Sequence, residues 1–148
     1  NLYALSIAQF LASTPSLSPS SVGEYLSDDK PVPARAAYFF MSSLELGGRS
    51  VAGALRELFN ALALPKEGQR IERILEAFSN AFYDANVGRR DVSPTVFPFK
   101  TRDACFVLVV ATVMLHTDLH NPRVESKMNK RSFTLQLSRC NDDEDFPE

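Results

Sequence analysis

The chain has 148 residues, of which 45% are hydrophobic and 23% charged, and its formal net charge is −2. This length suits one ordinary domain with a buried core, and the composition excludes a disordered chain. A slightly negative charge gives no sign of the basic surface that nucleic-acid binding uses. The sequence therefore predicts a single globular domain over residues 1–148 that binds no nucleic acid.

The sequence carries no signal for secretion or for insertion into a membrane. Its longest apolar run, Cys105 to Leu115, is too short to cross a bilayer, and no basic-then-apolar leader opens the chain. The two cysteines, Cys105 and Cys140, do not make a disulfide framework. We expect a cytosolic protein in which Cys105 is a small buried hydrophobe.

Apolar residues recur along most of the chain at the three- and four-residue spacing of an amphipathic helix. Ser18 followed by Pro19 is typical of a cap and a first helical residue, and Ser50 caps another helix that runs to about residue 62. A further helix is predicted around 37–44. The first helix is expected to bury one stripe: Tyr3, Ile7, Phe10 and Leu11.

The second half of the chain contains the two longest predicted helices. The longest runs from about Gln69 to Asn86, and residues 88–100 form a loop with two prolines. Residues 101–115 form a helix that is apolar nearly all round, which favours a place in the middle of a bundle, and Asn121-Pro122 ends it. A shorter helix is predicted over 132–139. No segment alternates like a strand, so the fold class is all-α.

Two segments carry most of the functional signal. Residues 64–69 read Leu-Pro-Lys-Glu-Gly-Gln, and residues 114–122 read Met-Leu-His-Thr-Asp-Leu-His-Asn-Pro. In this order they closely resemble the two signature motifs of the Sec-seven domain, which is the catalytic domain of guanine-nucleotide exchange factors for Arf-family small GTPases. The first family motif has Gly and Ala where Lys66 and Gly68 stand. The second motif differs only at His116, where the family has Asn.

Residues 7–11, 22–26 and 76–78 also look like successive helices of that family, so the resemblance covers essentially the whole chain. It implies a single-domain, right-handed multihelical array with a hydrophobic groove. By this resemblance the family's first and last helices are partly missing, so we expect a domain trimmed at both ends. The 88–100 loop is longer than the usual family connection, and its role is left open.

Glu67 has two interpretations. By itself, a Glu just after Pro65 and before a long helix complements the helix dipole, which contributes roughly 0.3–1 kcal/mol. The resemblance implies a catalytic role, because the matching Glu is the family's glutamic finger, inserted into the nucleotide site of the GTPase. A carboxylate about 4 Å from a phosphate charge repels it by roughly 4 kcal/mol at a dielectric constant of about 20, worth about three decades in release rate. We expect an unpaired, solvated carboxylate, with Lys66 as the residue most able to weaken it.

The resemblance also implies a groove that binds the switch regions of the GTPase. Carried over by position, its apolar wall is Phe106, Val110, Val113 and Met114, and its polar rim is Asp118 and Asn121. The alternatives remain open: the apolar four fit ordinary core residues, and the polar two fit helix termination with local backbone hydrogen bonds.

His116 and His120 lie one helical turn apart and could share a zinc ion, which is the main enzymatic alternative. The metalloprotease pattern requires Glu after the first His, where Thr117 stands, and no third histidine exists. We therefore expect no metal and no cofactor, and a protein that acts on GDP and magnesium held by its partner.

The predicted function is guanine-nucleotide exchange on an Arf-family small GTPase, without covalent chemistry. The alternative is a helical module that binds a GTPase without catalysis. Membrane contact is expected only indirectly, through the GTPase or other parts of a longer protein, at the cytoplasmic side of Golgi or endosomal membranes. Brefeldin-sensitive family members carry Tyr-Ser where Val110-Ala111 stand here, so we expect insensitivity to that drug.

Overall fold

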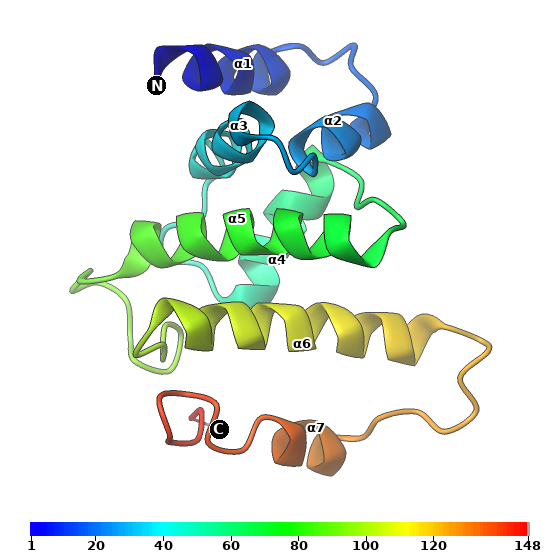
Figure 1. Cartoon of the computed structure of the whole chain (residues 1–148). Coiled ribbons are helices and arrows are strands. Elements are labelled where there is room, and N and C mark those ends of the chain that lie inside the picture. Colours follow the sequence, from blue (N-terminus) through cyan, green and yellow to red (C-terminus); the bar gives the residue numbers. More distant parts are fainter. Residues whose placement is uncertain (148) are drawn as a thin grey trace.

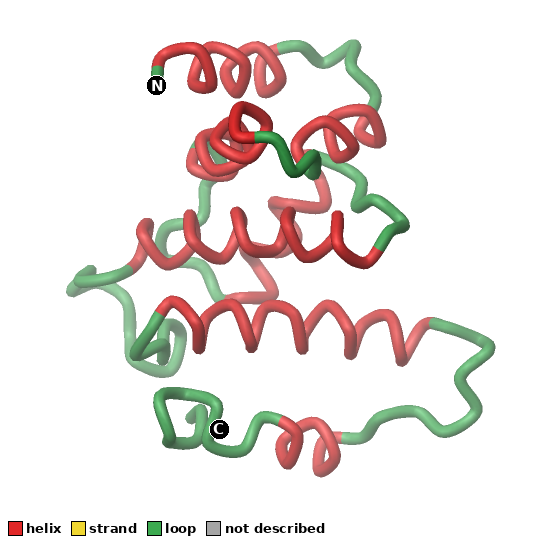
Figure 2. The backbone as a smooth tube through the Cα atoms, viewed as in Figure 1, coloured by secondary structure: helices red, strands yellow, loops and turns green. Residues whose placement is uncertain are grey.

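The computed structural model describes residues 1–147, and within them the chain forms seven helices and no strand (Figures 1 and 2). The all-α prediction is confirmed. Glu148, the last residue of the predicted domain, lies outside the described residues. The helices are α1 (Leu2–Ser13), α2 (Pro19–Leu26), α3 (Pro31–Ser42), α4 (Val51–Ala61), α5 (Gly68–Asn86), α6 (Arg102–His120) and α7 (Lys130–Gln136).

The helices stack in layers, with the two termini at opposite ends of the stack (Figure 1). α1 packs on α3, α3 on α5 and α5 on α6, while α2 contacts both α3 and α5. α5 and α6 run antiparallel in neighbouring layers (Figure 1). The start of α5 therefore lies beside the end of α6, which brings the two sequence motifs to the same side of the molecule.

Side-chain caps fix where several helices begin. The Oγ atoms of Ser18 and Ser50 accept backbone N–H bonds three residues on, at 3.0 and 3.2 Å, as predicted. Each such cap stabilises a helix by about 1 kcal/mol. At α7 the predicted bounds are wrong, because Asn129 caps the helix in a reciprocal capping box with Ser132. α7 thus begins two residues earlier than expected and ends three residues earlier.

The core is centred on α5, whose Phe78 and Phe82 are fully buried. The predicted stripe of α1 is wrong in part, because Tyr3 and Phe10 are 69% and 57% exposed. The residues that α1 buries completely are Ala4 and Ala8. Small side chains there let α1 approach α3 closely, so the large aromatic residues turn outward.

Residues 88–100 form the predicted loop, and its aromatic side chains pack back onto α5. The Phe97 ring lies 5.6 Å from the Tyr83 ring and 5.8 Å from the Phe82 ring, measured between centroids. Buried Asn141 ties the last part of the chain to this loop. Its amide donates to the Pro98 carbonyl at 2.8 Å, and its Oδ1 accepts the Lys100 N–H at 3.0 Å.

α6 is long and apolar enough, by length and composition alone, to cross a membrane. The sequence prediction took only residues 105–115 as the apolar run, whereas the helix spans 19 residues. Core helices of globular proteins have the same length and composition. α6 packs on α5 and contributes buried residues to the core. Part of its apolar surface is therefore used for packing inside this fold.

Gly23 is the glycine at which a side chain is least tolerated. A Cβ added there would lie 2.0 Å from the carbonyl oxygen of Ala63, in the segment that follows α4. We expect Gly23→Ala to lower the free energy of unfolding by about 2–3 kcal/mol. Urea denaturation measures this, with Gly53→Ala as the control, since a Cβ there would lie 3.4 Å from Ser50 Oγ and 3.7 Å from Arg49 Cβ, which are ordinary contact distances. Equal effects of the two substitutions would contradict the prediction.

Candidate functional site

An open apolar groove of about 830 Å³ runs between α5 and α6, with α7 contributing to one side. All six residues that the sequence analysis placed in a groove line this one. Their role in binding a partner stays a prediction. The lining residues are Gly68, Ile71, Glu72 and Leu75 from α5; Phe106, Val107, Val110, Ala111, Val113, Met114, Thr117 and Asp118 from α6; and Asn121, Val124, Gln136 and Leu137 beyond it.

The apolar character of α6 is divided between two faces. Cys105 and Val109 are completely buried in the core, and burial raises the pKa of the Cys105 thiol to about 12. Cys105 is thus the buried hydrophobe that the sequence predicted. The groove face differs, because Val110 and Val113 are only half-buried and Met114 is 56% exposed. The groove face thus keeps part of its apolar surface in water, while Val110 and Val113 also pack against the core.

The polar end of α6 holds the loop that follows it. Asp118 Oδ2 accepts the Met128 N–H at 2.8 Å, and Asn121 Oδ1 accepts the Arg123 N–H at 3.0 Å. The Lys127 ammonium also donates to the backbone carbonyls of Asp118 and Asn121. The local hydrogen bonds considered from the sequence are thus present, and the same two residues line the groove.

Glu67 is the N-cap residue of α5, with extended backbone and no side-chain capping bond. Its side chain is 68% exposed, and it directly precedes Gly68, the first α5 residue that lines the groove. The expectation of an unpaired carboxylate is wrong, because Glu67 Oε2 lies 3.4 Å from Arg70 Nε. The cation that pairs with Glu67 is therefore Arg70, whereas the sequence analysis had considered Lys66.

The α5 wall of the groove was missed by the sequence analysis. Ile71 and Leu75 lie on the apolar stripe that α5 turns toward the core, and Leu75 is only 2% exposed. Both nevertheless line the groove, together with Glu72. Their helical spacing was the available signal, but it cannot separate a core face from a groove wall.

His116 and His120 lie one turn apart on the exposed side of α6, with their rings tilted at 30° to one another. Their ring centroids are 4.2 Å apart, and His120 Nδ1 lies 2.8 Å from the His116 carbonyl oxygen. Across residues 1–147, no group of three His, Cys, Asp or Glu side chains is placed to hold a metal ion. Neither histidine lines the groove.

The fold and this site define a helical domain built around a solvent-open apolar groove with an acidic residue at one end. The family profile described as "Sec7 domain" matches residues 2–148, and the chain belongs to this family. The resemblance stated from the two motifs is thereby confirmed.

The relatives of the chain include proteins named as nucleotide-exchange factors, and a solved Sec7 domain bound to ARF1-GDP resembles it. The chain is 32% identical over 142 residues to the human "Brefeldin A-inhibited guanine nucleotide-exchange protein 1", covering 96% of this chain and 7% of that protein. It is 33% identical over 143 residues to the Arabidopsis thaliana "ARF guanine-nucleotide exchange factor GNL2", covering 97% and 10%. A solved structure described as "ARF1-GDP bound to Sec7 domain complexed with Brefeldin A" superposes with a TM-score of 0.82 at 31% identity, covering 97% of this chain and 68% of that one. The chain thus spans 7–10% of the length of the two named exchange factors.

Proposed function

We propose that this chain is an exchange domain that stimulates GDP release and GTP loading on an Arf-family small GTPase. The observation that carries the proposal is the exposed carboxylate of Glu67, which stands at one end of an open apolar groove. Relatives of the chain are named as exchange factors, and one solved Sec7 domain is described as bound to ARF1-GDP. These names support the choice of partner class.

The proposed mechanism combines docking with electrostatic repulsion. The groove takes up apolar side chains of the GTPase, and burial of its wall supplies binding free energy at about 25 cal/mol per Å² of apolar surface. Docking brings Glu67 to the phosphates and magnesium of the bound GDP. The carboxylate repels the phosphate and competes for the cation, so the nucleotide leaves faster. The chain itself needs no cofactor or metal for this role.

Membrane contact is proposed to be indirect. In a longer parent protein, the GTPase or other domains would bring this domain to the cytoplasmic face of Golgi or endosomal membranes. Relatives of which the chain covers 7–10% leave room for such domains.

A nucleotide-release assay separates the proposed function from its alternatives. The chain is mixed with a panel of Arf-type GTPases loaded with fluorescent GDP, and the release rate is measured with and without it. Acceleration of one or more GTPases supports the proposal. Binding in a pulldown without faster release would instead support a non-catalytic binding module, while stoichiometric zinc by elemental analysis would favour a metal-dependent enzyme.

Brefeldin A is expected to leave the stimulated exchange rate unchanged. Val110 and Ala111 both line the groove, and they supply neither the ring nor the hydroxyl of the Tyr-Ser pair found in sensitive family members. The rate is compared with and without the drug on the same GTPase. The human relative named as brefeldin A-inhibited serves as the positive control. Inhibition of both proteins at the same drug concentration would contradict the prediction.

A further inference from the structure

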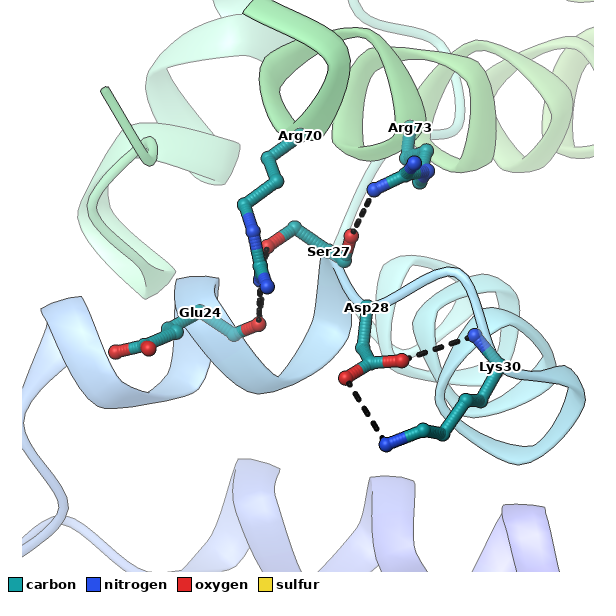
Figure 3. A network of polar contacts seen from close by, with 6 residues as sticks. All are labelled: Glu24, Ser27, Asp28, Lys30, Arg70 and Arg73. Atoms are coloured by element: carbon teal, nitrogen blue, oxygen red, sulfur yellow. Dashed lines mark hydrogen bonds and ion pairs between the residues drawn. The ribbon is translucent and has the colours of Figure 1, made fainter. Parts of the chain in front are cut away.

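Arg70 links the loop glutamate to the end of α2. Its Nη1 donates to the Glu24 carbonyl oxygen at 3.0 Å and to Ser27 Oγ at 3.1 Å, and its Nε lies 3.4 Å from Glu67 Oε2. Figure 3 shows Arg70 reaching from α5 to the last turn of α2, beside Arg73. Both of its α2 acceptors are uncharged, so the guanidinium keeps its full charge for the carboxylate of Glu67.

Helix geometry places this contact away from the groove. The groove wall of α5 is Gly68, Ile71, Glu72 and Leu75, a set spaced three and four residues apart on one face. Arg70 stands two residues after Gly68, which is a rotation of about 200° around the axis. The Arg70 side chain therefore lies on the α2 side of the helix, and its attraction draws the Glu67 carboxylate to that side.

We propose that Arg70 is a positioning residue that holds the Glu67 carboxylate toward α2, away from the groove, until a GTPase docks. The inference rests on the proposed function of Glu67. The carboxylate leaves Arg70 when the partner's magnesium and phosphates come within reach, and the backbone of the loop need not move. Removing the positive charge therefore frees the carboxylate and speeds the release step, while docking in the groove is unaffected.

The size of the effect follows from the exposure of the pair. The Glu67 side chain is 68% exposed and that of Arg70 is 30% exposed, so solvent screens their attraction. Exposed ion pairs of this kind are worth up to about 1 kcal/mol, which corresponds to about a fivefold change in rate. An ion pair of this strength favours the position of the carboxylate beside Arg70, and a docked partner can still break it easily.

Arg73 provides a matched control. It is also an arginine of α5, and its Nη1 donates to the Ser27 carbonyl oxygen at the end of α2 at 3.1 Å (Figure 3). Within residues 1–147, however, Glu67 forms its ion pair with Arg70 and not with Arg73.

The kcat and KM of stimulated exchange are measured for Arg70→Gln, Arg73→Gln and Arg70→Lys in the full chain. We expect Arg70→Gln to raise kcat two- to fivefold with KM within twofold. Arg73→Gln and the charge-preserving Arg70→Lys are expected to stay within twofold of the parent in both constants.

Two further measurements separate failure of this inference from failure of the proposed function. In a Glu67→Ala background, adding Arg70→Gln is expected to leave kcat unchanged. A gain in kcat there as large as the gain in the parent chain would overturn the positioning role. If Glu67→Ala alone leaves exchange unchanged, the proposed role of Glu67 fails, and if the parent chain accelerates no GTPase, the proposed function fails. NMR of the free protein then tests the contact without any exchange assay. Glu67→Gln should shift the Arg70 Nε–H resonance and leave that of Arg73 in place, and an unmoved Arg70 signal would overturn the inference.

Discussion

Replacement of Glu67 by lysine is expected to lower the stimulated rate of GDP release by about three orders of magnitude. The proposed mechanism assigns roughly 4 kcal/mol of repulsion to one carboxylate about 4 Å from the phosphate charge, and lysine turns that repulsion into attraction. Stopped-flow release of fluorescent GDP from the responsive GTPase measures the loss. Because the Glu67 side chain is 68% exposed, the fold should tolerate the change.

Glu76→Lys is the matched control for this prediction. Glu76 is also an exposed glutamate of α5, but it lies outside the groove. The same charge reversal there should leave the release rate within about twofold of the parent. Glu76 lies more than two helical turns from Glu67, so solvent and salt largely screen its charge from the phosphate of the GDP. An unchanged rate in Glu67→Lys would end the catalytic assignment. Equal losses in both variants would point to net charge and not to a specific carboxylate.

Met114→Asp is expected to weaken GTPase binding by about 100-fold while leaving the domain folded. Met114 lines the groove and is 56% exposed, so its thioether side chain is available to a partner. Burying such a side chain is worth about 1.5–3 kcal/mol, and a carboxylate in its place is desolvated without a counter-charge. Binding to a nucleotide-free GTPase, measured by calorimetry, should show the loss as an increase in Kd.

The same substitution at Leu119 tests whether the groove matters. Leu119 is a 46% exposed hydrophobe on the same helix, but it does not line the groove. Leu119→Asp should leave Kd within about threefold, because an exposed apolar side chain that a partner does not cover contributes little to binding. Equal weakening by the two variants would show that binding depends on the surface of α6 in general.

The parts of the fold that could be predicted from the sequence depend on local chemistry. Ser18 and Ser50 cap their helices whatever the rest of the chain does, because each hydroxyl bonds an amide three residues away. The groove face of α6 was predicted from the resemblance to the family motif, and the apolar composition of the helix agreed with it. A helix that is apolar all round has more apolar surface than one packing contact can cover.

The parts that could not be predicted depend on what a neighbouring element does. The outward turn of Tyr3 and Phe10 follows from the close contact between α1 and α3, which spacing along α1 does not reveal. The pairing of Glu67 with Arg70 depends on where α2 ends, since Glu24 and Ser27 hold the guanidinium there. A sequence pattern indicates which residues share one face of a helix. It does not indicate which element packs against that face.

The division of α6 into two faces separates two kinds of evolutionary constraint. Substitutions at Cys105 or Val109 alter a completely buried contact, so they are selected through folding. Under the proposed function, a change at the exposed Met114 alters the docking surface, so it would be selected through recognition of the GTPase. One helix can therefore diverge toward new partners on one side while its other side keeps the domain intact.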